Sequence, residues 1–371
     1  MVRSIDSMVS QRARQERRVL LVHESAQVRA SIRRILAEEA AVSVVDEAPD
    51  AYTAWERMRL CWPDLVILDV AMQHMDGMSF LRQIMRKRPT PVVICSAFTE
   101  RNKQLALEAL SHGAIAMIYR PAALDVGLGD PQAEDLRRTV RECLEVDAAR
   151  ARRVQRQPAN RSDRALPRRG RQSAAVVGIG ISTGGPRTLA TLLREIALPV
   201  PPIVIVQHMP QGFTGPLAER LDRITPLTVQ EAVDGMTLRS NHVYIAPAGR
   251  HTRLRRRAGD RIAFVIEPGE RVRHHMPSVD VLFDSMADQL HARAVGVLMT
   301  GMGDDGARGI ERLHQRGAVT MVQDEASCVV FGMPKAALAR HPRCPTLSVG
   351  EIATYLSQLR RYEREALREA G

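Results

Sequence analysis

The amino-acid sequence predicts two consecutive α/β domains, each with a mostly parallel sheet and helices on both faces. Short apolar runs that are typical of buried strands alternate along most of the chain with segments whose apolar residues recur at helical spacing. The chain has 371 residues, of which 45% are hydrophobic. At about 150 residues per domain, this length is enough for two hydrophobic cores.

The first predicted domain covers residues 18–147. Its five strands and five helices alternate strictly, which predicts a flavodoxin-like parallel sheet. The expected strands are 18–23, 42–45, 64–69, 91–96 and 114–119, and the expected helices are 26–39, 51–60, 78–88, 100–112 and 133–146. In such sheets functional groups gather beyond the carboxyl ends of the strands. Polar residues stand at several of these ends, among them His23, Glu24, Asp69, Ser96 and Arg120.

The second predicted domain covers residues 173–365. The expected strands are 174–180, 202–208, 243–245, 251–255, 262–266, 294–300 and 318–322, and the expected helices are 188–196, 215–221, 279–290 and 307–315. From residue 351 the sequence predicts a charged amphipathic helix, followed by a tail at 366–371. This pattern predicts a doubly wound, mostly parallel sheet.

The positive charge of the chain is local. The formal net charge is +11, and residues 150–171 contain nine Arg and one Asp. A segment of this kind, with Pro158, Pro167 and Gly170, predicts a solvated linker at 148–172. The alternative is a segment that binds an acidic partner or a polyanion. The rest of the chain is nearly balanced and shows no helix-turn-helix pattern, so we expect no specific nucleic-acid partner.

The ends of the chain and its cysteines indicate a cellular compartment. Residues 1–17 form a basic extension without the apolar stretch of a secretory signal. The chain has no run of 18 apolar residues, so we expect no membrane insertion. The five cysteines are scattered singly, which is unlike a disulfide framework or a zinc site. We therefore expect a cytoplasmic protein whose thiols are small buried hydrophobic groups.

The first domain resembles a response-regulator receiver domain. The resemblance rests on residues 68–72 (LDVAM) and 75–77 (MDG), which match the phosphoacceptor loop of that family. It implies that Asp69 is the phosphorylated carboxylate and that the Ser96 hydroxyl contacts the phosphoryl group. It also implies a Mg²⁺ site at Glu24 and Asp69, because this hard cation prefers carboxylate oxygens.

Three positions depart from the receiver pattern. His23 stands where the family has the first of two adjacent acids, and Gln73 replaces a proline. Arg120 replaces the lysine that contacts the phosphoryl oxygens, and its planar guanidinium differs from a compact ammonium. Because a carboxylate is missing, we expect weak magnesium binding and slow phosphorylation of Asp69.

Three strand ends of the second domain carry a serine, a histidine and an acid. Ser182 lies in the segment GISTGG, His208 in QHMP, and the acids in TGMGDDG at 300–306. A serine hydroxyl is a weak nucleophile near neutral pH and needs a base, which in turn needs an orienting carboxylate. The glycines beside Ser182 allow close approach of a substrate, and the following helix start offers N–H groups to an oxyanion.

Each of these features alone also has a structural explanation. A serine in a glycine turn before a helix is most often an N-cap, and a lone strand-end histidine is more often structural than catalytic. The GMGDDG turn is compatible with a plain loop or a cation site. Gly178, Gly180 and Gly184 imitate a dinucleotide-binding fingerprint, but their spacing differs from it. The second strand also ends in Gln207-His208, where that fingerprint needs an acid.

Taken together, several separated blocks resemble the chemotaxis protein-glutamate methylesterases (CheB family). These blocks are residues 180–185, 207–210, 277–283 (PSVDVLF), 300–306, 323–325 (QDE) and 332–334 (GMP), and the resemblance covers nearly the whole chain after residue 17. It implies that Ser182 is the nucleophile, His208 the general base and Asp305 the orienting acid. Asp305 is preferred over Asp304 because the family places this acid directly before the last glycine. Thr183 and Met302 match positions that shape the oxyanion site.

The resemblance implies an enzyme that hydrolyses glutamate methyl esters on methylated chemoreceptors and that also deamidates receptor glutamines. No cofactor is implied for this chemistry, and a chemotaxis histidine kinase is implied as the partner that phosphorylates the receiver domain. Two other functions remain open, a non-catalytic signalling scaffold and a polyanion-binding regulator that uses residues 150–171. The intact Ser182, His208 and Asp305 favour the enzyme.

Overall fold

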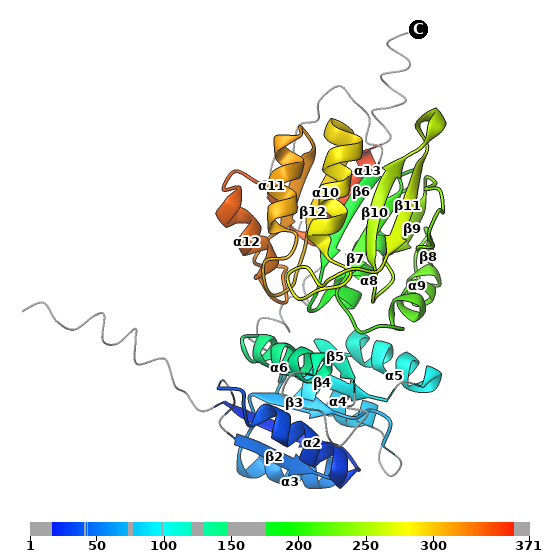
Figure 1. Ribbon diagram of the computed structural model, residues 1–371. Helices are drawn as coiled ribbons and strands as arrows, with labels where there is room; N and C mark the ends of the chain where they lie inside the picture. The colour runs from blue at the N-terminus through cyan, green and yellow to red at the C-terminus, as the bar shows by residue number, and fades with distance from the viewer. Residues whose placement is uncertain are drawn as a thin grey trace, which may run out of the picture. The chain divides into compact units, whose positions relative to one another are not determined.

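The computed structural model describes residues 17–40, 42, 44–72, 77–97, 99–119, 130–146 and 176–359 (Figure 1). The chain divides into two compact units, Met1–Ala148 and Ala149–Gly371. The division falls within the predicted linker 148–172. The linker, nearly all of the N-terminal extension and the C-terminal tail lie outside the described residues.

The first unit has the predicted flavodoxin-like sheet. Its parallel strands are β1 (Arg18–Val22), β2 (Val44–Ala48), β3 (Leu65–Leu68), β4 (Val92–Ser96) and β5 (Ala116–Tyr119), in the order β2-β1-β3-β4-β5. Its helices are α2 (Ala26–Leu36), α3 (Ala51–Leu60), α4 (Gly77–Lys87), α5 (Glu100–Ser111) and α6 (Pro131–Leu144). The strand order reverses between β1 and β3, so that His23 and Asp69, which follow these strands, are neighbours at the reversal.

The second unit contains a seven-stranded parallel sheet and a two-stranded antiparallel one, and its elements alternate as predicted. The parallel strands are β6 (Val176–Ile181), β7 (Ile203–Gln207), β8 (Thr228–Glu231), β9 (His242–Ile245), β12 (Ala294–Leu298), β13 (Val319–Gln323) and β14 (Thr346–Leu347), in the order β14-β13-β12-β6-β7-β9-β8. Strands β10 (His251–Arg256) and β11 (Ile262–Glu267) form the antiparallel pair.

Helices cover both faces of the large sheet (Figure 1). Helices α10 (Val279–Leu290) and α11 (Ala307–Gln315) lie in front of β6 and β12 in this view, while α8 (Gly185–Glu195) packs with α13 (Val349–Gln358) behind the sheet. The remaining helices are α9 (Thr214–Asp222) and α12 (Met333–Arg340), with short 3-10 turns at Ala258–Asp260 and His291–Arg293. The predicted doubly wound α/β class is confirmed.

Two glycines of β6 let α10 pack closely on the sheet. A Cβ at Gly180 would lie 2.3 Å from Cγ1 of Val279, and a Cβ at Gly178 would lie 2.4 Å from Sδ of Met286. A side chain at either position would push α10 away from β6. The glycines that imitate a nucleotide-binding fingerprint therefore serve helix packing, and they bring the first turn of α10 close to the end of β6.

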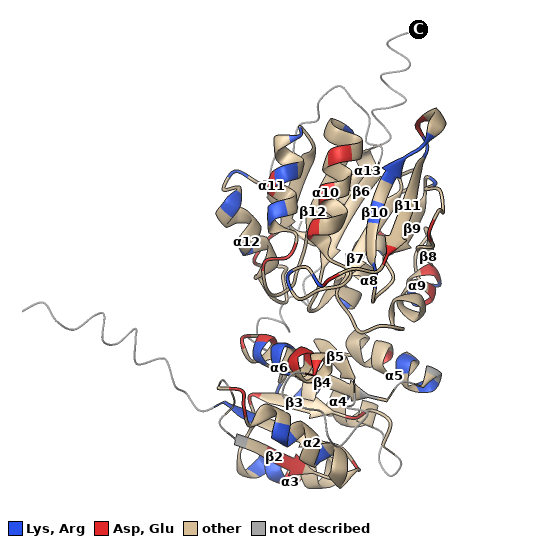
Figure 2. Ribbon diagram, in the orientation of Figure 1, with Lys and Arg blue, Asp and Glu red and all other residues tan. Residues whose placement is uncertain are grey.

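Ion pairs link α10 to α11 on the exposed side. Asp280, Asp284 and Asp288 of α10 alternate with Arg308, Arg312 and Arg316 at a spacing of four residues on each helix (Figure 2). The closest pairs join Arg308 to Asp284 at 2.7 Å and Arg312 to Asp288 at 2.8 Å. The pairs of Asp284 and Asp288 are partly exposed and contribute little individually, about 0–1 kcal/mol, but together they favour one register of the two helices.

Several details differ from the sequence predictions. Strands β8 and β14 and helix α12 were not predicted, and the C-terminal helix begins before residue 351, at Val349. Ser348 caps that helix, and Glu351 completes a capping box. Cys61 is exposed, so the expectation of buried thiols is wrong for this residue, whereas the other four cysteines are buried.

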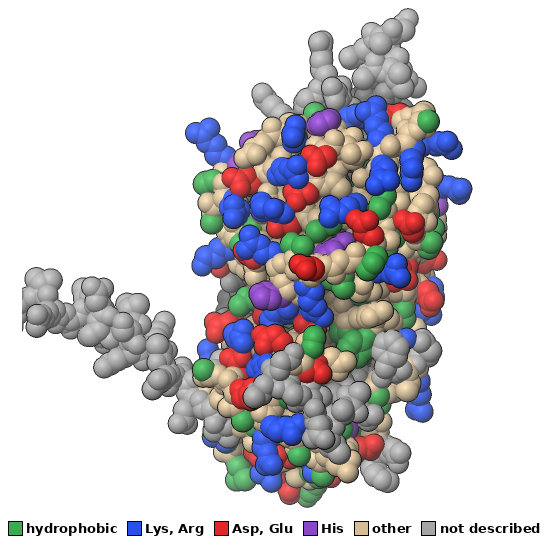
Figure 3. Space-filling view, in the orientation of Figure 1, with side chains coloured by type: hydrophobic (Ala, Val, Ile, Leu, Met, Phe, Trp, Pro, Cys, Tyr) green, Lys and Arg blue, Asp and Glu red, His purple; other side chains and the backbone are tan. Residues whose placement is uncertain are grey.

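The described surface of the second unit carries mixed charge. Figure 3 shows Lys and Arg side chains interspersed with Asp and Glu on the face turned to the viewer. This mixture differs from the single-sign field of a surface that tracks nucleic-acid phosphates. No helix among the described residues is long and apolar enough to cross a membrane.

Candidate active site

Three neighbouring strands of the second unit bring the predicted serine, histidine and acid to one edge of the sheet. Strands β12, β6 and β7 are adjacent, and the chain order reverses between β12 and β6. The His208 amide donates to the carbonyl of Ile181 at 3.0 Å, and the Ser182 amide donates to the carbonyl of Thr300 at 2.9 Å. The three segments are thus hydrogen-bonded to one another at the carboxyl ends of the strands, where parallel sheets bind ligands.

Ser182 does not cap the helix that follows it. The N-cap of α8 is Gly184, with φ +79° and no side-chain cap bond, so the N-cap interpretation of Ser182 is wrong. A Cβ at Gly185 would lie 1.9 Å from Oε1 of Gln207, so the turn depends on glycine there as well. Ser182 is 7% exposed, and its hydroxyl is not engaged as a cap. It is therefore available for chemistry at the bottom of a tight turn.

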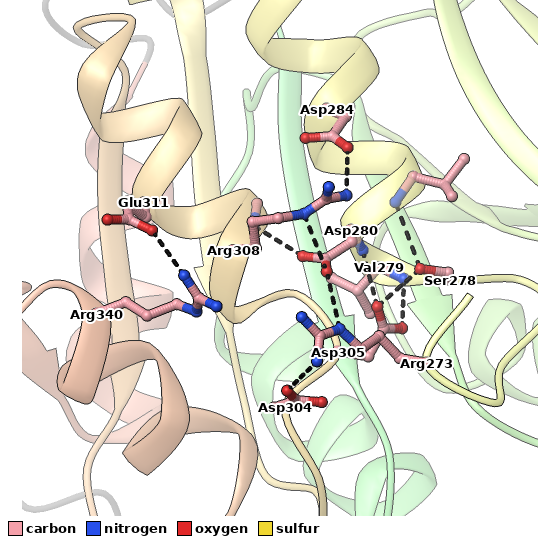
Figure 4. A network of polar contacts seen from close by, with 12 residues as sticks. Arg273, Ser278, Val279, Asp280, Asp284, Asp304, Asp305, Arg308, Glu311 and Arg340 are labelled. Carbon is pink, nitrogen blue, oxygen red and sulfur yellow. Dashed lines mark hydrogen bonds and ion pairs between the residues drawn. The ribbon is translucent and has the colours of Figure 1, made fainter.

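Asp305 is a buried carboxylate that is fully supplied with donors. Its Oδ1 accepts from the Ser278 hydroxyl at 2.7 Å and from the Asp280 amide at 3.1 Å, and its Oδ2 accepts from the Val279 amide at 2.7 Å (Figure 4). These three residues are the N-cap and first turn of α10, where free N–H groups and the helix dipole favour an anion.

The imidazole of His208 completes the set. Its Nε2 lies 2.8 Å from Oδ2 of Asp305. Burial raises the pKa of Asp305, but the hydrogen bond from His208 and the donors of α10 outweigh it and lower the pKa below its ordinary value. The carboxylate is thus ionised at neutral pH and accepts the proton on Nε2 of His208. Nδ1 of His208 then carries the lone pair, and this buried atom has no hydrogen-bond partner among the described residues.

The surroundings of Ser182 provide N–H groups for an oxyanion. Thr183 is buried and Met302 half-buried, and within the described part of the chain neither backbone amide donates a hydrogen bond to protein. A Cβ at Gly301 would lie 2.6 Å from Cβ of Ser182, so the segment that carries Met302 lies directly against the serine. The structure places both predicted oxyanion residues beside Ser182.

Three residues that were not predicted to have a role hold this site together. Gln207 is buried, and its Nε2 donates to the carbonyls of Ser182 at 3.0 Å and of His208 at 2.9 Å. Ser278 caps α10 and binds Asp305, and Oε1 of Gln323 accepts from the Thr300 amide at 2.8 Å. All three lie in sequence blocks that carry the family resemblance, but a buried glutamine or serine has no spacing pattern that reveals its partner.

The predicted phosphoacceptor pocket of the first unit joins His23 to Asp69. Nε2 of His23 lies 3.4 Å from Oδ2 of Asp69, and the Ser25 amide donates to Nδ1 of His23 at 3.0 Å. Because Nδ1 accepts this bond, the ring proton of the neutral imidazole lies on Nε2, on the side of Asp69. The Ala71 amide donates to Oδ1 of Asp69 at 2.8 Å.

These residues do not fit a magnesium ion, which demands oxygen ligands in near-octahedral geometry. An imidazole N–H lies beside Asp69 instead of a second carboxylate. The guanidinium of Arg29 binds the carbonyl of His23 at 2.7 Å and that of Glu24 at 3.1 Å, which places a positive charge near the pocket. Among the described residues no three metal-ligating side chains cluster. Arg120, Gln73 and the Ser96 side chain lie outside the description.

Comparisons with known proteins agree with this geometry. Residues 177–356 match the CheB methylesterase family, and residues 19–127 match the response regulator receiver domain family. A protein-glutamate methylesterase/protein-glutamine glutaminase of Chromobacterium violaceum is 40% identical over 355 residues, which cover 92% of this chain and 99% of the relative. One from Geobacter metallireducens is 44% identical over 337 residues, covering 87% of this chain and 93% of the relative.

The chain belongs to the CheB methylesterase family. The catalytic domain of the Thermotoga maritima CheB methylesterase, a crystal structure, is 37% identical and covers 51% of this chain and 100% of its own, with a TM-score of 0.49. The relatives match over nearly their whole length, and the two family matches give this chain a receiver domain followed by a CheB domain.

Proposed function

We propose that this protein is a protein-glutamate methylesterase that hydrolyses glutamate methyl esters on methylated chemoreceptors and is regulated through its receiver domain. The observation that carries the proposal is that the His208 imidazole binds the buried Asp305 carboxylate through Nε2, while its Nδ1 has no hydrogen-bond partner among the described residues and its amide binds the carbonyl of Ile181, directly before Ser182. A serine nucleophile needs such a base, oriented by a carboxylate and with its second ring nitrogen available.

The reaction proceeds by acyl transfer to Ser182. The Ser182 oxygen attacks the ester carbonyl while Nδ1 of His208 takes the hydroxyl proton. The N–H groups of Thr183 and Met302 stabilise the oxyanion. The proton then passes from His208 to the leaving methoxide, and methanol departs from the acylated serine. A water molecule, deprotonated by His208, attacks the acyl group, and the carboxylate of glutamate and the free serine are released.

The same steps deamidate a receptor glutamine, because its side-chain amide differs from the ester only in the leaving group. His208 then gives its proton to the departing amide nitrogen, which leaves as ammonia, instead of to methoxide. The proposed chemistry uses only side chains and backbone groups of this chain, and it calls for neither a metal nor an organic cofactor.

The receiver domain supplies the regulatory input. We infer that the chemotaxis histidine kinase is its partner and that Asp69 is the phosphoacceptor. Asp69 is 8% exposed, and both of its oxygens face N–H donors. Donors on both oxygens reduce the nucleophilicity of a carboxylate, so transfer to Asp69 is slow. Incubation with acetyl phosphate followed by intact-mass measurement tests this inference, and an unmodified wild-type chain refutes it.

The decisive experiment for the enzyme is methanol release from methylated receptor. We expect Ser182→Ala and His208→Ala each to abolish release while their thermal unfolding stays cooperative. Full activity in Ser182→Ala excludes the serine mechanism. A wild-type chain that binds receptor without releasing methanol supports the scaffold alternative. DNA binding that weakens steeply with salt and is lost when residues 150–171 are deleted supports the polyanion alternative.

A further inference from the structure

A second histidine lies flat against the catalytic one. The rings of His208 and His275 are stacked with their centroids 3.6 Å apart and their planes within 4°. The side chain of His208 is 6% exposed, and within the described part of the chain its ring makes one hydrogen bond, from Nε2 to Asp305. One hydrogen bond at the ring edge leaves the imidazole free to tilt about that bond, whereas contact on the ring face opposes tilting.

The segment that carries His275 is a tight turn with strained backbone. The Val272 amide donates to the carbonyl of His275 at 3.1 Å, and the His275 amide donates to the carbonyl of Val272 at 2.9 Å. Between them, Arg273 has φ +53° and His274 has φ +67°. Two left-handed central residues define a type I′ turn, which ordinarily uses Asn and Gly. Left-handed non-glycine residues persist only where their surroundings hold them, and they cluster at functional sites.

Asp304 ties the turn to the loop that carries Asp305. Nη1 of Arg273 lies 2.5 Å from Oδ2 of Asp304 (Figure 4). Asp304 is the acid of the GMGDDG motif that the catalytic assignment leaves unused, and it directly precedes Asp305. The same loop therefore acts on His208 in two ways. Asp305 binds the edge of the ring, and Asp304 binds Arg273 of the turn whose His275 covers the face of the ring.

We propose that His275 is a positioning residue for the esterase reaction, held by the Arg273–Asp304 ion pair, and that its ring fixes the plane of the His208 imidazole in which Nδ1 takes the Ser182 proton. This inference rests on the proposed function. It assigns separate tasks to the two adjacent acids, orientation of the base by Asp305 and retention of the turn by Asp304. His275 itself exchanges no proton with the substrate.

The test compares two substitutions of similar size in the full-length chain. His275→Phe keeps a flat ring on His208, and His275→Leu removes it. Rates are measured as methanol release and as inactivation by diisopropyl fluorophosphate, which forms a bond from the Ser182 oxygen to phosphorus and expels fluoride. We expect His275→Leu to lower kcat and the inactivation rate by at least about 10-fold with little change in KM, because misplacement by about 1 Å costs up to 10²-fold. His275→Phe stays close to the wild type.

The ion pair is tested with a matched control. Asp304→Asn is expected to lower kcat in the same direction as His275→Leu but by less. Glu311→Gln breaks the exposed pair with Arg340, 3.1 Å long and remote from the turn, and is expected to leave kcat unchanged. Equal rates for His275→Leu and the wild type overturn this inference alone. A wild-type chain that neither releases methanol nor reacts with the fluorophosphate overturns the proposed function and this inference together.

Discussion

Gly301 offers a direct test of whether Ser182 must lie where the structure places it. In Gly301→Ala the new Cβ would lie 2.6 Å from Cβ of Ser182 and 2.3 Å from Sδ of Met333. The flexible end of Met333 can yield, whereas a shift of Ser182 strains the hydrogen bond from its amide to the Thr300 carbonyl. To reach 3.4 Å, where ordinary contact begins, Ser182 must retreat by about 0.8 Å. Such a displacement predicts a loss in kcat on the order of 100-fold and a loss of stability of about 1–3 kcal/mol.

The assay is methanol release by full-length protein, with the free energy of unfolding measured in urea. The matched control is Gly296→Ala in β12, the strand that leads into the Gly301 loop, because its Cβ would lie 2.6 Å from Cδ1 of Leu313, a flexible side-chain end away from Ser182. The control is expected to lose stability but to retain kcat. A Gly301→Ala variant that folds and turns over at the wild-type rate would refute the placement of Ser182 as nucleophile against Gly301.

Three further predictions follow from other parts of the structure. Asp305→Asn should lower kcat by roughly 10⁴-fold while some turnover remains, because an amide facing Nε2 favours the wrong tautomer of His208; stopped assays of methanol release check this, and an unchanged kcat contradicts it. Burial raises the pKa of Asp280 from 3.8 to about 6, so the folded chain binds this proton more tightly than the unfolded one, and stability falls as pH rises from about 4 to about 6. The pKa shift corresponds to about 3 kcal/mol of unfolding free energy. The stability of Asp280→Asn relative to the wild type should therefore rise by up to that amount across this pH window. Urea unfolding of both proteins at pH 4 and pH 7 checks this, and the same stability difference at both pH values would contradict it. His23→Asp should supply the missing carboxylate, so that acetyl phosphate modifies Asp69 faster in Mg²⁺ than in EDTA. The rate for the wild-type chain, measured by intact mass, should depend little on Mg²⁺. A wild-type rate that depends as strongly on Mg²⁺ would show that His23 does not disable the site.

The sequence was sufficient to predict the two parallel sheets because their strands are buried on both faces. Such strands are continuous apolar runs, as in β3 (LVIL) and β7 (IVIVQ), and glycines or polar residues mark their ends. The missed strand β8 (TVQE) lies at the edge of its sheet, where burial is partial and the apolar signal fades. The missed helix α12 is short and begins with Met-Pro, a start signal that is weak without a capping side chain.

The residues that carry the chemistry of the site could be predicted from the sequence, but the residues that hold them in place could not. Ser182, His208 and Asp305 stand at strand ends beside glycine turns, which spacing and residue type reveal. Their supports depend on contacts between distant segments, such as Gln207 on Ser182 and Ser278 on Asp305, 27 residues apart in the chain. In the receiver domain the sequence revealed a substitution but not its effect on the pocket. The sequence revealed that His23 replaces an acid, but only the structure shows that the imidazole donor side faces Asp69.

The two buried acids at the start of α10 explain why one of them can serve the histidine. Asp305 accepts from a hydroxyl, two amides and an imidazole. Among the described residues, Oδ1 of Asp280 accepts only from the Gly309 amide, and its Oδ2 makes no hydrogen bond but lies 3.6 Å from Arg308 and 4.0 Å from Arg273. Both are buried, so the difference in donors decides which one holds the charge, and the negative charge on Asp305 further raises the pKa of Asp280. Environments that push two neighbouring carboxyl pKa values apart assign the acids to different tasks. The helix start therefore does more than cap a helix, because it keeps Asp305 ionised at the pH where Nδ1 of His208 must act as a base.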